Sequence, residues 1–140
     1  LTKLVKPTKI LMGKKDYQQL YLVSNFIEKN FQVITIGCNT VRDKNKVALS
    51  SRNNLLSKKD LLIASKLTKK LIIFKKKLKF KRNIKKILLQ KHKQLENILK
   101  IKIEYLELRN LYNLQSSNTL EKSKLFVAYY VRDVRLIDNF

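Results

Sequence analysis

The chain has 140 residues, 44% of them hydrophobic, with two glycines, one proline and one cysteine. This composition excludes a disordered or low-complexity chain, and the single cysteine excludes an internal disulfide and a multi-cysteine metal site. The formal net charge of +22 suggests a polyanionic partner, but lysine spread over helix faces is also typical of an ordinary solvated surface. A basic RNA-binding module is therefore one alternative.

The apolar runs of the sequence are short. The longest, at 61–64 and 71–74, cannot span a bilayer, and no signal-peptide pattern opens the chain. Together with the lone cysteine, this favours a cytoplasmic protein without membrane association. The chain begins at Leu1, directly in an amphipathic stretch, and we expect a further segment upstream of it.

The first 39 residues alternate between strand and helix patterns. An apolar run at 9–12, ended by Gly13, predicts a buried strand, and helical spacing of apolar residues predicts a helix over 16–30. The β-branched stretch 32–38 predicts a second strand. Strand, helix and strand in this order predict a βαβ unit with a parallel sheet, which is typical of an α/β fold.

A polar, irregular segment at 39–54 predicts both a domain boundary and a binding loop. After it, Ser57 and Asp60 form a capping box that opens a helix to about Leu78. The remaining pattern predicts a second helix that packs on the first, and a small antiparallel sheet. These elements are expected at 84–100 for the helix, and at 102–109, 124–131 and 134–137 for the strands.

The single histidine and the single cysteine are not expected to act in catalysis. His92 lies among lysines within the second of these helices, which favours a surface position. Cys38 ends an apolar strand, which favours a small buried side chain over a nucleophile.

The first candidate site is Gly13-Lys14-Lys15-Asp16, where a parallel strand ends and a helix begins. Such edges bind nucleotides, because the helix N-terminus offers free backbone N–H groups. Lys15 could contact phosphate, Asp16 could accept hydrogen bonds from ribose hydroxyls, and Gln19 would project to the same side of the helix. A simple helix start explains the same string, so the motif alone leaves both interpretations open.

The second candidate site is Leu49-Ser50-Ser51-Arg52-Asn53. Two hydroxyls and a guanidinium on one loop suit oxyanions, and Arg52 could stabilise a pyrophosphate leaving group through bidentate hydrogen bonds. The string is also ordinary loop composition, so taken alone it does not decide between binding and structure.

Taken together and in order, these strings resemble the pantothenate synthetase (pantoate-beta-alanine ligase) family. The resemblance rests on G-K-K-D-Y-Q-Q-L, T-V-R-D, A-L-S-S-R-N and V-R-L-I-D-N, and on the spacing between them. It extends from about Leu4 to Asn139 and is thin through the lysine-rich helices between Lys58 and Lys100. It corresponds to the C-terminal half of the family's chain.

The resemblance implies an enzyme that condenses D-pantoate with beta-alanine through a pantoyl adenylate, releasing pyrophosphate and then AMP. Mg²⁺ would accompany the ATP, with no protein metal ligand visible in these residues. The family's N-terminal motif with two histidines is absent from the 140 residues, so the chain alone is expected to be inactive. The implied partners are small molecules and, in the full-length protein, a second copy; no nucleic acid or membrane is expected. A degenerate remnant without activity is the other alternative.

The resemblance also assigns roles to individual residues. The ATP contacts that it implies are Gly13, Lys14, Lys15, Asp16, Val41, Leu49, Ser50, Ser51 and Arg52. Within this set, Lys15, Ser50, Ser51 and Arg52 would be catalytic, Val41 would contact adenine through its backbone, and Gln19 would bind pantoate.

The implied fold is the tail of a Rossmann-like nucleotide-binding domain at 1–39, followed by a small α+β lid domain at 40–140 with two helices and a short antiparallel sheet. The sequence departs from the family's pattern at three positions. Lys14 stands where a Glu is usual, Asn39 where a Pro is usual, and Lys46 where a Gly is usual; the last is expected to stiffen the loop that follows.

Overall fold

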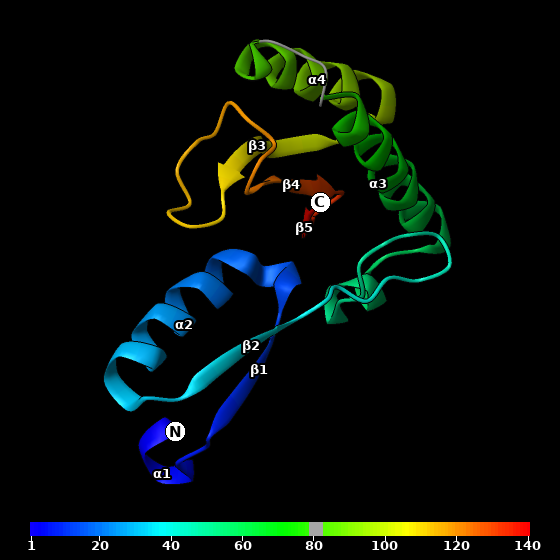
Figure 1. Cartoon of the computed structure of the whole chain (residues 1–140). Helices are drawn as coiled ribbons and strands as arrows, with labels where there is room; N and C mark the ends of the chain where they lie inside the picture. The colour runs from blue at the N-terminus through cyan, green and yellow to red at the C-terminus, as the bar shows by residue number, and fades with distance from the viewer. Residues whose placement is uncertain (79–82) are drawn as a thin grey trace. The chain divides into compact units, whose positions relative to one another are not determined.

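The computed structural model describes residues 1–78 and 83–140, which divide into two compact units (Figure 1). The division falls between Val41 and Arg42, whereas the sequence placed the domain boundary after Asn39. The first unit is an α/β unit and the second is an α+β unit, so the fold class predicted from the sequence is confirmed.

The first unit is the predicted βαβ unit. Strands β1 and β2 pair in parallel, with Lys9 opposite Ile34 and Gly13 opposite Cys38, and helix α2 lies between them in the chain. The elements of this unit are α1 (Thr2–Val5), β1 (Lys9–Gly13), the 3₁₀ turn η1 (Lys14–Asp16), α2 (Tyr17–Phe31) and β2 (Ile34–Cys38).

Helix α2 packs on one face of this small sheet through its apolar stripe. Leu20 and Ile27 of the helix are buried, together with Val33 before β2. Gly37 permits this approach, because a methyl group there would lie 3.1 Å from Leu20 Cδ2 and 3.0 Å from Lys14 Cε. A side chain at position 37 would therefore require the Leu20 and Lys14 side chains to shift.

The opposite face of the same sheet carries exposed apolar side chains. Leu11 is 69% exposed and Ile34 is 57% exposed, because strand alternation directs them away from α2. Cys38 belongs to the same exposed set, so the expectation that it is buried is wrong. A run of apolar letters predicted burial on both faces, but the described residues cover only one.

The second unit begins its helical part at the predicted capping box. Ser57 Oγ donates to Asp60 Oδ2 at 2.6 Å, while the Asp60 and Ser57 backbone N–H groups bond reciprocally to the two side chains at 3.2 Å each. These bonds hold the pKa of Asp60 below its usual value. The helices that follow are α3 (Lys58–Leu78) and α4 (Ile84–Leu99), which pack on each other as expected.

A three-stranded antiparallel sheet completes the second unit, in the order β3-β4-β5. Strand β4 is central and is buried along almost its whole length, with α3 packed against it and α4 packed against β3. The strands are β3 (Lys102–Asn110), β4 (Ser123–Val131) and β5 (Val134–Asn139). The largest apolar side chains with almost no exposed surface are Leu67, Leu71, Leu78, Leu95, Leu108, Leu125, Val127 and Val131.

Burial of this core is the main stabilising contribution in the second unit. Each fully buried leucine or valine contributes about 1.5–3 kcal/mol relative to an exposed one. No helix among the described residues is long and apolar enough to cross a bilayer.

The segment that was expected to be an irregular loop contains two ordered pieces. Residues 42–48 form a tight turn closed by an antiparallel bridge between Arg42 and Ala48, and Ser51–Leu55 form a 3₁₀ helix, η2. Neither piece has the length for a periodic pattern, which is why the sequence did not predict them.

Candidate nucleotide site

The first candidate motif lies at the carboxyl end of the parallel strands. Gly13 is the last residue of β1, the single turn η1 carries Lys14, Lys15 and Asp16, and α2 starts at Tyr17. This is the edge at which open parallel sheets bind ligands. Asp16 occupies the N-cap position of α2 but makes no side-chain capping hydrogen bond, so its exposed carboxylate is directed to solvent rather than to the helix.

Gly13 is not required by the packing or by the backbone conformation. Its φ of −71° is open to any residue, and a methyl group there would meet no atom of the described residues within 4 Å. The glycine therefore leaves the backbone accessible to a close neighbour. That is the arrangement in which glycine lets a phosphate or ribose approach a turn.

Lys14 points along the carboxyl edge of the sheet. Its ammonium donates to Asn39 Oδ1 at 3.1 Å, which joins η1 to the segment after β2. Lys15 is half-buried, whereas Gln19, in the first turn of α2, is exposed. The structure thus brings the motif residues and Gln19 together on one strand-turn-helix junction, as their spacing predicted.

The second candidate motif follows a tight turn. Asp43 Oδ1 accepts from the backbone N–H of Asn45 at 2.9 Å and of Val47 at 2.8 Å, which fixes the turn from both sides. Lys46 within it has a φ of 71°, the left-handed region that favours glycine. A lysine therefore occupies a strained position here.

The loop after this turn presents the predicted phosphate ligands. Ser50 caps η2, and its Oγ accepts from the Arg52 backbone N–H at 3.3 Å. Ser51 and Arg52 are exposed, and the Arg52 guanidinium Nη1 donates to the Arg135 carbonyl of β5 at 3.0 Å. Leu49, at the entry to the loop, is 53% exposed. Two hydroxyls and one guanidinium therefore stand on a loop tied to a strand.

The candidate residues are distributed over both units. Val41 is the last residue of the first unit and is 66% exposed, while Leu49, Ser50, Ser51 and Arg52 belong to the second unit. Their assignment to one ATP molecule stays a prediction.

Sequence reasoning missed a buried ion pair beside the loop. Arg42 donates from Nη1 to Asp138 Oδ2 at 2.6 Å and from Nη2 to Asp138 Oδ1 at 2.8 Å, and the Asp138 side chain is 4% exposed. The sequence did contain one indication of this pair. Only ten acidic residues occur in the chain, and Asp138 lies within an apolar strand, where a charged side chain needs a partner.

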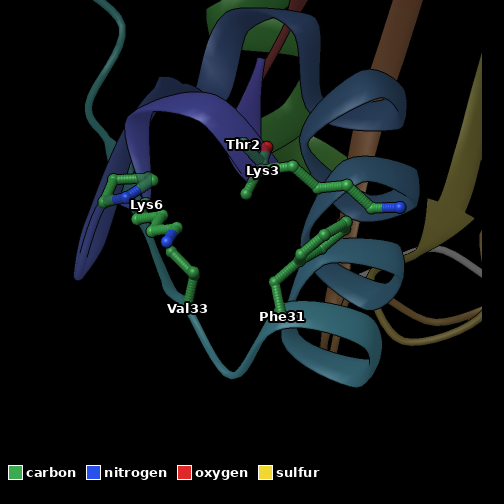
Figure 2. A pocket seen from close by; sticks show the side chains of 6 residues that line it. Thr2, Lys3, Lys6, Phe31 and Val33 are labelled. Atoms are coloured by element: carbon green, nitrogen blue, oxygen red, sulfur yellow. The ribbon is translucent and has the colours of Figure 1, made fainter.

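A hollow in the first unit lies away from the predicted site. It has a volume of about 340 Å³ and is formed by residues before β1 and before β2, at the amino end of the parallel strands (Figure 2). Parallel sheets bind ligands at the opposite end. Its lining residues are Thr2, Lys3, Lys6, Pro7, Phe31 and Val33.

No cluster of acids, histidine or cysteine able to hold a metal ion occurs among residues 1–78 and 83–140. His92 is half-buried, with its Nε2 3.4 Å from Glu96 Oε2 on the next turn of α4. The expected surface position holds only in part, because one side of the imidazole is covered and Glu96 is an acidic neighbour that the sequence analysis did not consider.

The fold defines the class of protein as α/β, with a parallel βαβ unit followed by a small α+β unit. A family model of pantoate-beta-alanine ligase matches residues 1–140, the whole chain. The chain belongs to the pantoate-beta-alanine ligase family.

Two curated relatives illustrate the match. A pantothenate synthetase of Clostridium botulinum (strain ATCC 19397 / Type A) is 35% identical, over 98% of this chain and 50% of the relative. One from Flavobacterium psychrophilum is 31% identical, over 99% of this chain and 50% of the relative. The chain thus spans about half the length of the curated relatives it matches.

Solved structures of the same enzyme share the fold. A pantothenate synthetase from Thermus thermophilus aligns with a TM-score of 0.79 at 28% identity, covering 99% of this chain and 51% of that one. A pantoate-beta-alanine ligase from Francisella tularensis, complexed with beta-gamma ATP and beta-alanine, aligns with a TM-score of 0.73 at 29% identity. That alignment covers 99% of this chain and 45% of the other. These matches favour the ligase over the RNA-binding alternative.

Proposed function

We propose that these 140 residues supply half of an ATP-dependent ligase that condenses D-pantoate with beta-alanine. The observation that carries the proposal is the match of the ligase family along the whole chain. The geometry supports it: a glycine-lysine-aspartate turn stands at the carboxyl end of a parallel strand, and a serine-arginine loop is anchored in the second unit.

The reaction would proceed in two balanced steps. A pantoate carboxylate oxygen attacks the α-phosphorus of ATP, and the bond to the bridging oxygen breaks, so that pyrophosphate leaves with the electron pair. The neutral amine of beta-alanine then attacks the acyl carbon and loses a proton, and AMP leaves. Neither step needs a side-chain nucleophile, so positioning and charge stabilisation are what the protein must provide.

Most of the candidate residues have a specific part in this scheme. Lys15 and the α2 N-terminus would bind phosphate, and the exposed Asp16 carboxylate would accept from the ribose hydroxyls. Gln19 would hold pantoate. The backbone of Val41 would contact adenine, and Arg52 with the Ser50 and Ser51 hydroxyls would stabilise the departing pyrophosphate.

Mg²⁺ enters the proposal as part of the MgATP substrate. The described residues form no cluster that would hold the ion by themselves, so its ligands would be the phosphates and residues elsewhere. The proposed setting is the cytoplasm, and the proposed assembly of the full-length enzyme is a homodimer.

The test is pantoate-dependent exchange of labelled pyrophosphate into ATP. It requires this chain joined to the family's other half, supplied by a relative such as the Clostridium botulinum enzyme. Exchange that needs D-pantoate, and AMP release that needs beta-alanine as well, would support the proposal. Exchange with a different carboxylate would instead indicate another adenylate-forming enzyme.

The residue roles are tested in the same assay. Lys15→Ala and Arg52→Ala should each reduce exchange by about 10²–10³-fold, the usual cost of removing a group that stabilises transition-state charge. The 140 residues alone should give no exchange. Activity of the chain alone would contradict the proposal that it supplies only half of the site.

A further inference from the structure

We propose that Asp138 is a positioning residue, which aims the phosphate-binding loop at 49–52 by holding Arg42. The proposal rests on the proposed function for the identity of the ligand, and on the contacts of the second unit for the mechanism. Asp138 lies near the end of β5, and its partner Arg42 lies 96 residues earlier in the chain, shortly before the loop.

The pair is built to be rigid. Arg42 meets the carboxylate of Asp138 with both terminal nitrogens, at 2.6 and 2.8 Å, and its Nη2 also donates to the Asn139 carbonyl at 3.2 Å. The Arg42 guanidinium lies 5.0 Å from the centre of the Phe140 ring. Two parallel charge-assisted bonds fix the plane of the guanidinium as well as its position.

Arg42 passes this constraint to the turn before the loop. Its Nη1 donates to the Lys46 carbonyl at 3.0 Å, at the residue that carries the strained φ of 71°. The end of this turn also contacts η2, because Asn53 Nδ2 donates to the Ala48 carbonyl at 3.1 Å. A continuous chain of contacts therefore runs from Asp138 to the segment that contains Ser50, Ser51 and Arg52.

Strand β5 holds the far side of the loop as well. The Arg135 carbonyl accepts from Arg52 Nη1 at 3.0 Å, and the Arg135 side chain is itself fixed by Glu104, with distances of 2.7 and 3.0 Å. β5 therefore holds the loop at two points. Asp138 holds the turn before the loop through Arg42, and the Arg135 carbonyl holds Arg52 within the loop. Loss of the Arg42–Asp138 pair should leave the loop attached to β5 through Arg52 but change its orientation.

The test compares two arginine variants in the enzyme completed with the family's other half. Arg42→Met removes the tie, and Arg132→Met is the matched control. Arg132 donates to Asp60, whose side chain is 7% exposed, so both variants leave a buried carboxylate without an arginine. Both should lower thermal stability. Only Arg42→Met should raise the KM for ATP by about tenfold or more, with the KM for pantoate nearly unchanged.

A second measurement needs no substrate. In the 140-residue chain, hydrogen exchange at the Val47, Arg52 and Asn53 amides should accelerate by about tenfold in Arg42→Met relative to core amides of β4, and not in Arg132→Met. Arg42→Lys keeps the charge but cannot make the two parallel hydrogen bonds of a guanidinium. Its ATP KM and its loop exchange rates should therefore lie between those of wild type and Arg42→Met. This variant also keeps the test valid if Arg42→Met does not fold.

The outcomes separate this inference from the proposed function. An inactive completed enzyme with accelerated loop exchange in Arg42→Met would refute the ligase proposal and leave the positioning role standing. Equal effects of the two arginine variants on the ATP KM, or loop amides that do not respond to Arg42→Met, would overturn the positioning role.

Discussion

The two units differ in how completely they bury their apolar side chains. The second unit encloses a core in which Leu67, Leu95 and Leu125 have no exposed surface. The first unit buries Leu20 and Ile27 of its helix α2 against one face of the sheet and leaves the apolar residues on the other face open to solvent.

This difference indicates that the first unit depends on additional protein to cover its sheet. Parallel sheets are normally covered on both faces, and a two-stranded sheet is marginally stable by itself. Because the chain spans about half the length of its relatives, we expect the rest of the family's fold to cover the exposed face of β1 and β2.

The largest expected effect comes from separating the two units and testing whether each one folds by itself. Residues 42–140 alone should unfold in one cooperative thermal transition, because they retain the core and the Arg42–Asp138 pair. Residues 1–41 alone should show no cooperative transition. Circular dichroism against temperature measures both. Cooperative melting of the shorter piece would contradict the account of the exposed face.

The next prediction compares a leucine from each unit. Leu95→Ala, at a site with no exposed surface, should lower the free energy of unfolding by about 2–5 kcal/mol. Leu11→Ala, at a site that is 69% exposed, should change it by less than about 0.5 kcal/mol. Urea unfolding of the 140-residue chain gives both values. A large loss from Leu11→Ala would show that this face is already covered.

A smaller effect is expected in the turn of the second unit. Lys46→Gly should raise the free energy of unfolding by about 1 kcal/mol, because glycine adopts the φ of 71° without strain. Lys44→Gly, two residues earlier and outside the left-handed region, is the matched control and should be destabilising. The same urea experiment decides, and a destabilising Lys46→Gly would show that the lysine side chain contributes more than its backbone costs.

The smallest effect is a pH dependence within the second unit. Hydrogen bonds from Ser57 hold the pKa of Asp60 below its usual value, and the Arg135 side chain does the same for Glu104. Lowered carboxyl pKa values give stability that is complete above the ordinary values and is lost as the pH falls through the folded ones. Melting temperatures should therefore be constant above about pH 5 and fall below about pH 4. Asp60→Asn should reduce the fall of the melting temperature at low pH. An unchanged pH dependence in this variant would contradict the contribution assigned to Asp60.

The regular elements of both units could be predicted because their signals are local. The capping box at Ser57 and the helical spacing up to Leu78 placed α3 correctly, and alternation in 102–109 placed β3 to within a residue. The parallel pairing of β1 and β2 followed from the order of strand, helix and strand. The helix and strand signals depend on residues close together in the chain, and the parallel pairing depends only on the order of neighbouring elements.

The contacts between distant segments could not be predicted in this way. Nothing in the periodicity pairs Arg42 with Asp138, although both lie in strings that supported the family resemblance. Lys14 and Asn39, which depart from the family's pattern separately, contact each other at 3.1 Å. The roles of the candidate site residues toward ATP and pantoate stay predictions, because they concern ligands rather than the chain's own contacts.

The tie from β5 also has a consequence for the order of folding. A ribosome that has released α3 and α4 has already exposed the turn at 42–48, but the partner of Arg42 is still to be synthesised. Contacts of such long sequence separation form late, after the loop between them has been closed. The loop at 49–52 should therefore lack its contacts with β5 on a nascent chain. Under the proposed function, ATP binding should appear only after β5 has paired with β4.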